Sequence, residues 1–229
     1  MKAISSMRRV VAIAAGAAFA AGTWAAVDPG RAGLSLLLVA AAVIVGGAAW
    51  LESGLGSAKE LALVAALAGV AAAGRVLFAP IPGVQPVTVI VVAAGVALGL
   101  RAGIAVGAIA ALVSNLFLGQ GPWTPWQMLA WAACGAVGAA AAPALRRRIP
   151  FAVACCVLGF AFSGFMDVWN WLAYFPHTWQ ALTLTWGRGI WFDAAHALGN
   201  LVIALAAGPE LRRMLERYGK KLHTEVVWA

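Results

Sequence analysis

The sequence predicts an all-α integral membrane protein, and three observations support this class. Hydrophobic residues make up 63% of the 229 residues, charged residues make up only 10%, and the mean hydropathy is +0.90. The apolar residues gather into eight runs that are separated by short polar, glycine-rich or proline-rich segments. The basic residues behind the net charge of +8 lie in particular connections between these runs. Since no polar stretch is long enough to form a soluble domain, soluble enzymes and nucleic-acid-binding modules are excluded.

Each apolar run is a candidate membrane helix, because an α-helix needs roughly 20 apolar residues to span a bilayer. The runs are Val10–Val27, Leu34–Leu51, Ala58–Phe78, Val87–Leu100, Gly103–Leu118, Gln127–Leu145, Phe151–Ala173 and Ile190–Ala207. Between the short fourth and fifth runs, Gly99, Arg101 and Gly103 predict a tight turn with a charge at its tip. The first run also resembles a secretory signal ending near Ala25, but its length favours a retained helix.

The distribution of Lys and Arg predicts the orientation of the chain. With a cytoplasmic N-terminus, thirteen basic residues fall on the inner side and only Arg31 and Arg188 fall outside, while Arg75 lies within a helix. The inner residues are Lys2, Arg8, Arg9, Lys59, Arg101, Arg146, Arg147, Arg148, Arg212, Arg213, Arg217, Lys220 and Lys221. Because cytoplasmic loops are enriched in Lys and Arg, we expect a multi-pass protein of the bacterial plasma membrane with both termini in the cytoplasm.

The stretch Ser114–Met128 interrupts the apolar pattern most strongly. It combines amides, glycines, tryptophans and two prolines, and proline has no backbone N–H to donate. We therefore expect a structured outer loop over Gly119–Trp126. The other outer connections are expected at Asp28–Gly33, Ala79–Pro86 and Tyr174–Gly189, of which the last is the longest.

Most tryptophans fall near the predicted outer surface. These are Trp123, Trp126, Trp169, Trp171, Trp179, Trp186 and Trp191, with Trp131 one turn deeper and Trp24 at the end of the first helix. Only Trp50 marks the inner interface. An interfacial aromatic belt explains any single tryptophan, but a belt forms at both interfaces. The one-sided excess predicts that several rings line an outward-facing cavity.

The last two predicted helices carry polar stripes. Ser163, Asp167, Asn170 and Tyr174 share one face of the seventh helix, and Asp193, His196 and Asn200 share one face of the eighth. Ionisable groups at membrane depth by default mark a functional site. The alternative is a structural network, for example between Asp167 and His196. Arg188 would neutralise an aspartate or bind an anionic ligand, and a solvated loop arginine fits the sequence equally well.

The third run carries small residues at helical spacing and one charge. Ala58, Ala62 and Ala66 form one ridge, and Ala65, Gly69 and Ala73 form another. Such ridges allow close approach of a second helix, within the chain or on a partner. Arg75 near the outer end of this run must reach the interface or find a partner.

The three cysteines, Cys134, Cys155 and Cys156, lie in apolar runs without metal-type spacing. We interpret them as small buried hydrophobic residues. We expect no metal site and no cofactor.

The order of these features resembles the substrate-binding S component of energy-coupling-factor (ECF) vitamin transporters. The resemblance follows a small-residue helix, the loop Pro-Ile-Pro-Gly-Val-Gln-Pro-Val-Thr, a glycine-turned hairpin, Asn115 and then Gly-Gln-Gly-Pro-Trp-Thr-Pro-Trp-Gln-Met. It covers residues 58–215 as a six-helix substrate-binding core. Residues 1–57 would form a two-helix extension whose role the family does not explain, and residues 216–229 a basic cytoplasmic tail.

The resemblance implies a high-affinity binding subunit that reorients to release its substrate inward. Its partners would be a coupling transmembrane subunit, which docks on Ala58, Ala62 and Ala66, and two ATPase subunits. The chain itself lacks a Gly-x-x-x-x-Gly-Lys-Ser/Thr phosphate loop. Residues 81–88 would form a lid over the pocket. The implied substrate-binding residues are Gln85, Thr88, Asn115, Gln120, Trp123, Thr124, Trp126, Gln127, Asp167, Asn170, Trp171, Arg188, Trp191, Asp193, His196 and Asn200.

A pocket of tryptophans and amides suits a large, flat, partly apolar molecule. A cobalamin-like corrinoid is the first expectation, and other vitamins or their precursors stay open. Two other classes compete with the binding subunit. Ser163 and His196 resemble the catalytic pair of rhomboid-type intramembrane proteases, although Ala161 replaces a glycine of that family and the two helices are consecutive. Asp167 and Asp193 would alternatively serve as proton sites of a secondary transporter.

Overall fold

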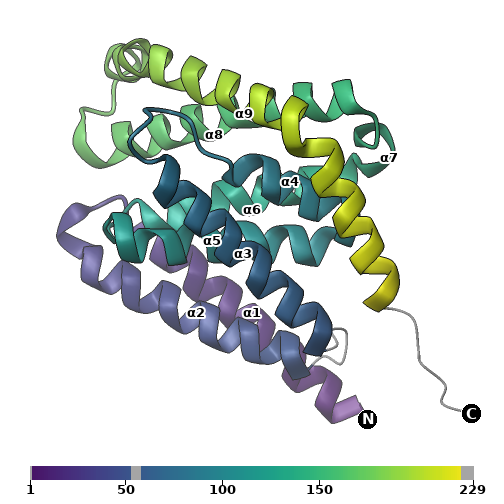
Figure 1. Ribbon diagram of the computed structural model, residues 1–229. Coiled ribbons are helices and arrows are strands. Elements are labelled where there is room, and N and C mark those ends of the chain that lie inside the picture. Colours follow the sequence, from purple (N-terminus) through teal and green to yellow (C-terminus); the bar gives the residue numbers. More distant parts are fainter. Residues whose placement is uncertain (1, 53–57, 223–229) are drawn as a thin grey trace, which may run out of the picture.

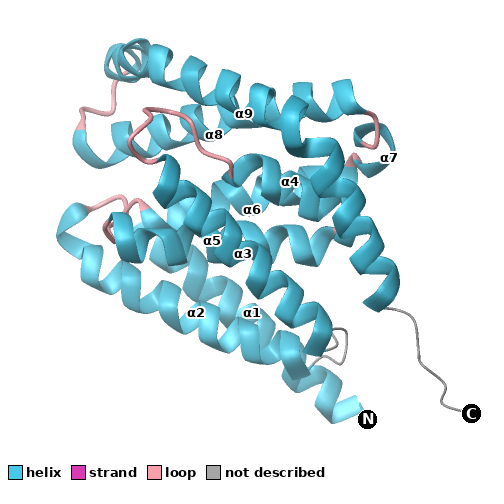
Figure 2. Cartoon of the chain, viewed as in Figure 1, coloured by secondary structure: helices cyan, strands magenta, loops and turns pink. Residues whose placement is uncertain are grey.

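The computed structural model describes residues 2–52 and 58–222, and these are helical without any strand (Figures 1 and 2). The elements are α1 (Lys2–Ala25), the short 3-10 helix η1 (Pro29–Arg31), α2 (Ala32–Glu52), α3 (Ala58–Phe78), α4 (Val87–Leu98), α5 (Leu100–Leu118), α6 (Thr124–Ala140), α7 (Ala142–Leu145), α8 (Arg148–Tyr174) and α9 (Trp179–Leu222). Predictions for residues 53–57 and 223–229, and for the side chains of Lys2, Arg8, Arg9, Trp50 and Lys221, lie outside the described part.

The protein is an all-helical, membrane-embedded chain. Among the described residues, four helical segments are long and apolar enough to cross a bilayer: Ala58–Phe78, Leu100–Leu118, Arg148–Tyr174 and Trp179–Lys220. Shorter apolar helical segments are Val10–Ala25, Pro29–Val43 and Val87–Leu98. The predicted fold class therefore agrees with the structure at this coarse level.

Helix α4 is the centre of the bundle. Every residue from Val87 to Val96 is buried, because α5, α6 and α9 surround the helix. The close approach of α4, α5 and α6 depends on glycine. A Cβ atom at Gly95 would overlap the carbonyl oxygen of Gly135, and one at Gly138 would press on the backbone of Val92. Removing side chains at such positions lets membrane helices pack backbone to backbone.

The connections α1–α2, α3–α4, α5–α6 and α8–α9 lie at one end of the bundle, called here the loop end (Figure 1). The opposite end carries Arg146, Arg212 and Lys220 together with the first turn of α3 and is called here the basic end. The glycine turn predicted between the fourth and fifth runs is present at Gly99, which has a φ of 90°, but Arg101 and Gly103 already belong to α5 and the charge does not stand at the tip of the turn. The outer loop predicted over Gly119–Trp126 is shorter than expected, because only residues 119–123 connect α5 to α6. Pro125 stands in the first turn of α6, where its missing N–H is tolerated.

The N-terminal hairpin of α1 and α2 packs beside α6, and two tryptophans of the core attach it (Figure 1). The indole N–H of Trp126 donates to the carbonyl of Thr23 at 3.0 Å, and that of Trp169 donates to the carbonyl of Ala26 at 3.1 Å. The ring of Trp126 also lies 5.2 Å from that of Phe165, between ring centroids. The hairpin is therefore fixed to the core at the loop end.

The prediction of a long outer loop over Tyr174–Gly189 is wrong. Helix α9 begins at Trp179, so only residues 175–178 connect it to α8. The hydroxyl of Thr178 accepts a hydrogen bond from the N–H of Ala181 at 3.2 Å, which caps the new helix. No proline follows until Pro209, so nothing in this stretch forbids a helix.

Helix α9 also continues past its predicted end at Ala207. It contains Pro209 and runs to Leu222, so residues 216–222 of the predicted tail are helical. Figure 1 shows that α9 changes direction along its length, as expected for a proline inside a helix. Leu215 is fully buried, which gives the segment after Pro209 a packed face across the basic end of the bundle.

Candidate functional site

A polar cluster lies among apolar helices near the loop end, with Arg75 of α3 at its centre. Arg75 is only 7% exposed. Its Nη1 donates to Ser114 Oγ at 2.7 Å and to Asn115 Oδ1 at 2.6 Å, and its Nε donates to Gln85 Oε1 at 3.3 Å. Within the described residues, no carboxylate forms an ion pair with this guanidinium. Arg75 thus keeps a positive charge at membrane depth that only neutral groups solvate.

Asn115 extends the cluster to α6. Its Nδ2 donates to Thr124 Oγ1 at 2.9 Å and to Gln127 Oε1 at 2.8 Å. Thr124 in turn donates to Gln120 Oε1 at 2.9 Å, and Gln120 Nε2 donates to the carbonyl of Leu112 at 2.9 Å. One continuous hydrogen-bond chain therefore joins α3, the loop before α4, α5, the α5–α6 connection and α6.

Trp131 connects this cluster to α8. The Arg75 guanidinium carbon lies 5.0 Å from the centroid of the Trp131 ring, within cation–π range. The indole N–H donates to Thr88 Oγ1 at 3.2 Å. Phe162 of α8 stacks on Trp131 with a centroid distance of 4.2 Å and an interplanar angle of 19°.

His196 of α9 holds the loop of residues 79–86 against the bundle. Its Nδ1 lies 2.6 Å from the carbonyl oxygen of Gly83, and because a carbonyl only accepts, the ring N–H donates. Asn200 lies one turn further along α9, with its Nδ2 at 3.3 Å from His196 Nε2 and at 2.8 Å from the His196 carbonyl. The loop therefore covers the loop end of the bundle in this arrangement.

Two carboxyl groups face each other between α8 and α9. Asp167 of α8 lies next to Asp193 of α9, and its Oδ2 packs against Gly189. The hydroxyl of Ser163 lies near Asp193 without reaching hydrogen-bond geometry. Ser163 Oγ and Asp167 Oδ2 are both buried without a hydrogen-bond partner among the described residues. Unsatisfied oxygens at membrane depth are expensive, so this set is the second candidate site.

The structure distributes the predicted substrate-binding residues over three groups. Gln85, Asn115, Gln120, Thr124 and Gln127 join the Arg75 cluster, and Thr88 reaches it through Trp131. His196 and Asn200 form the loop anchor, and Asp167 and Asp193 form the carboxyl pair. The remaining residues lie apart from these groups.

Several of those remaining residues have other surroundings. Trp126 bonds to the N-terminal hairpin, and Trp171 donates to the carbonyl of Pro176 at 2.9 Å. Trp123 makes an edge contact with Trp169 at 6.2 Å between ring centroids. Trp191 is 84% exposed on α9, where an interfacial ring belongs. Arg188 is exposed, and Asn170 is half-buried on α8.

Arg75, Ser114, Trp131 and Phe162 were not predicted as substrate-binding residues, and Gly83 was predicted only as part of the lid over residues 81–88. Arg75 had a clear signal, since it is a charge inside an apolar run. Ser114 and Trp131 gain their role from neighbours on other helices. Gly83 contributes its carbonyl, which every residue has, so no residue type could have marked it.

The predicted Ser–His pair is not formed. Ser163 Oγ has no hydrogen-bond partner among the described residues, and His196 is bonded to Gly83 and Asn200 instead. A serine nucleophile needs a base within hydrogen-bond reach. This arrangement does not bond Ser163 to the histidine.

The small residues of α3 remain uncovered. Ala58, Ala62 and Ala66 are exposed, and so are Ala65 and Gly69. A Cβ atom at Gly69 would meet nothing within 4 Å. The face that the sequence predicted for close helix packing thus has no partner within the described chain.

No protein-family model, curated protein or solved structure matches the chain.

Proposed function

We propose that the chain is the substrate-binding S component of an ECF-type importer in the bacterial plasma membrane, with both termini in the cytoplasm. The single observation that carries this proposal is the Arg75 cluster beneath the docked loop. Amide, hydroxyl and guanidinium groups from four segments converge there at membrane depth. Few convergent polar groups among apolar and aromatic walls are typical of small-molecule sites.

The docked loop supplies the expected entrance. A ligand reaching the cluster from the loop end has to displace residues 79–86, which are held by the His196–Gly83 hydrogen bond and by the bond between Arg75 and Gln85. Polar groups of the ligand would then replace some of the hydrogen bonds that the amides of the cluster now make to one another. Trp131 and Phe162 provide flat apolar walls. A vitamin-sized molecule of mixed polarity, with a corrinoid as first choice, fits these walls and amides.

The uncovered face of α3 supports the assignment of partners. A membrane helix of a coupling subunit would pack on Ala58, Ala62 and Ala66, which leave room for backbone approach. ATP hydrolysis would take place on two further subunits. In this division of labour the chain recognises the substrate and performs no chemistry on it. The two N-terminal helices add to the six-helix core, giving eight in all.

Native mass spectrometry of the protein purified in mild detergent from its own membranes tests the proposal. We expect a bound mass in the vitamin range, and partner subunits that include an ATPase pair. A chain that retains neither ligand nor partners in several mild detergents would contradict the S-component assignment.

A binding measurement with cyanocobalamin tests the site and the first substrate choice. Gln127→Leu removes one amide of the cluster, and Gln180→Leu makes the same change at an exposed position at the start of α9. We expect roughly five- to 150-fold weaker binding for the first variant only, because losing a hydrogen bond to a buried polar group costs about 1–3 kcal/mol. Equal affinities of both variants for cyanocobalamin would show that the Arg75 cluster does not bind this ligand.

The carboxyl pair favours a second candidate, a proton-coupled secondary transporter. Asp167 and Asp193 lie side by side within the membrane, where paired carboxyl groups are suited to proton relay. Uptake into proteoliposomes that contain this chain alone, driven by a pH gradient, would support the transporter. The S component predicts binding but no such uptake.

A further inference from the structure

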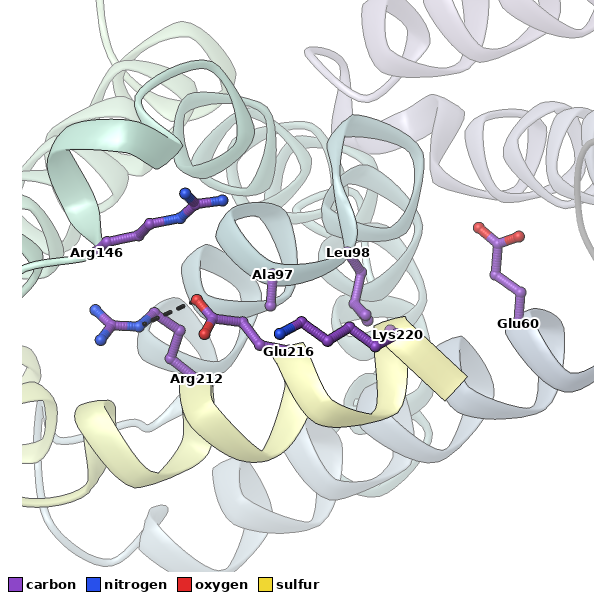
Figure 3. Close-up of a pocket in the computed structure, with 8 residues that line it drawn as sticks. Glu60, Ala97, Leu98, Arg146, Arg212, Glu216 and Lys220 are labelled. Atoms are coloured by element: carbon purple, nitrogen blue, oxygen red, sulfur yellow. Dashed lines mark ion pairs between the residues drawn. The ribbon is translucent and has the colours of Figure 1, made fainter. Parts of the chain in front are cut away.

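A cavity of about 820 Å³ lies at the basic end of the bundle, far from the loop-end site (Figure 3). Ala97 and Leu98 at the end of α4 form its apolar part. Arg146, which follows α7, and Arg212 of α9 line it as well. The proposed transport function does not use this cavity.

The cavity exists because α4 is short. At 1.5 Å per residue, its 12 residues rise about 18 Å, well below the roughly 30 Å of a bilayer core. The segment of α9 after Pro209 crosses the basic end instead, and Leu215 anchors it in the core. Gly219 approaches Leu98 at the far side of this crossing. The space between the end of α4 and the crossing segment is the cavity.

Three basic residues, Arg146, Arg212 and Lys220, line the cavity together with the two carboxylates of Glu60 and Glu216, so the lining carries a formal excess of one positive charge. Arg212 is held in place, since its Nη1 donates to the carbonyl of Leu145 at 3.1 Å and its Nε lies 3.5 Å from a carboxylate oxygen of Glu216. The Nε itself is buried and makes no hydrogen bond within the described residues. Arg146 has no ion pair or hydrogen bond in the part of the chain that the structure describes. Figure 3 shows Arg146 and Arg212 at the same side, with the carboxylate of Glu60 at the opposite side.

We propose that this cavity binds the phosphate of an anionic phospholipid headgroup. Guanidinium groups bind phosphate through paired N–H donors, and Arg146 and Arg212 both line the cavity. The apolar part at Ala97 and Leu98 suits the glycerol and upper acyl region of the lipid. The cavity also stands at the end of the bundle where basic residues gather, as in other sites for anionic lipids between helices. A bound headgroup would bridge the end of α7 and the crossing segment of α9.

The test measures binding of short-chain phosphatidylglycerol to the detergent-purified full chain by native mass spectrometry. Arg146→Gln removes the unpartnered guanidinium, and Arg147→Gln makes the same charge change at the neighbouring exposed residue outside the cavity. We expect about fivefold weaker binding for Arg146→Gln, the effect of one basic residue at an anionic lipid surface. Arg147→Gln should bind like the unmodified protein. Equal weakening in both variants, or none in either, would overturn the proposal.

Two further ligands separate the possible sources of the phosphate. Phosphatidylcholine carries the same phosphate with a compensating cation, and we expect weaker binding that does not depend on Arg146. Glycerol 3-phosphate is the soluble counterpart, and we expect it to compete poorly because it has no acyl region. Competition at equal concentration would show that the cavity takes a free phosphate ester and would overturn the lipid assignment. The outcome does not depend on which substrate the loop-end site binds.

Discussion

His196 on α9 donates a hydrogen bond of 2.6 Å to the carbonyl oxygen of Gly83 in the loop between α3 and α4. This bond joins residues 113 positions apart and is the main polar attachment of the loop to the last helix. Gly83 has a φ of 76°, which few other residues adopt without strain. The same glycine lies tightly against the backbone of Phe192 and His196. The loop thus depends on both the missing side chain and the hydrogen-bonded carbonyl of Gly83.

We predict that Gly83→Ala destabilises the protein by about 1–2 kcal/mol, the cost of a left-handed backbone for an L-residue. The melting temperature in detergent should fall by roughly 2–4 °C for each kcal/mol. A thiol-reactive dye measures the melting temperature, because Cys134 and Cys155 are buried and become reactive on unfolding, while the half-buried Cys156 sets the starting signal. Gly164→Ala is the matched control, since a Cβ atom there meets nothing within 4 Å. Equal melting of both variants would mean that the loop is not held as described.

Arg75 is predicted to be essential for the polar cluster. Arg75→Met removes the donors to Gln85, Ser114 and Asn115. Leaving a buried polar group unsatisfied costs about 1–3 kcal/mol, so we expect clear destabilisation in the same dye assay. Arg75→Lys keeps the charge but loses the planar fork of donors. Its melting temperature should lie between those of the unmodified protein and Arg75→Met. Arg188→Met is the control, because exposed substitutions usually stay within about 0.5 kcal/mol. If Arg75→Met and Arg188→Met have the same melting temperature, the cluster contributes nothing to stability.

The sequence predicts helices well where apolar runs have clear ends. The bounds Ala58–Phe78 match α3, because Pro80 and Pro82 follow the run. The sequence does not predict the start of α9 at Trp179, because the two glycines of Trp186-Gly187-Arg188-Gly189 have a low helix propensity and favour a loop. Tertiary contacts stabilise a helix there, since Trp186 donates to the carbonyl of Gly164 at 3.2 Å and Gly189 makes room for Asp167.

The site was predicted in its residue types but not in its grouping. The amides of Ser114–Met128 and the stripes on α8 and α9 are polar residues in apolar surroundings, which a sequence reveals. Which of them meet depends on how helices pack, and Arg75 meets residues about forty positions away. The tryptophans show the limit most clearly. Trp126 and Trp169 bond to backbone carbonyls of residues 23 and 26, and a carbonyl acceptor carries no sequence signal.

The double variant Trp126→Phe with Trp169→Phe should loosen the N-terminal hairpin. Phenylalanine keeps most of the aromatic contact but has no N–H to donate to Thr23 or Ala26. We expect faster amide hydrogen exchange in peptides covering residues 19–31, because local opening governs exchange. Peptides from α8 and α9 should exchange as before. Trp191→Phe is the control at an exposed ring. Unchanged exchange near residue 26 would show that the hairpin is attached by other contacts.

The glycine contact between α4 and α6 is expected to be intolerant of any side chain. A Cβ atom at Gly95 would overlap the carbonyl oxygen of Gly135, and backbone atoms give way at high cost. Overpacking a tight core costs about 1–3 kcal/mol or more, so Gly95→Ala should lower both yield and melting temperature. Gly69→Ala on the uncovered face of α3 makes the same change in open space. Similar melting of the two variants would contradict the close approach of α4 and α6.

The uncovered face of α3 predicts a variant that separates folding from assembly. Ala62→Leu with Ala66→Leu fills the ridge where the coupling subunit is proposed to dock, while both positions are exposed in the chain itself. The melting temperature and ligand binding should therefore stay unchanged, while partner subunits no longer co-purify. Ala206→Leu adds the same side chain at an exposed position on α9 and should keep the partners. A lower melting temperature would mean that the face packs within the chain, and retained partners would move the docking surface elsewhere.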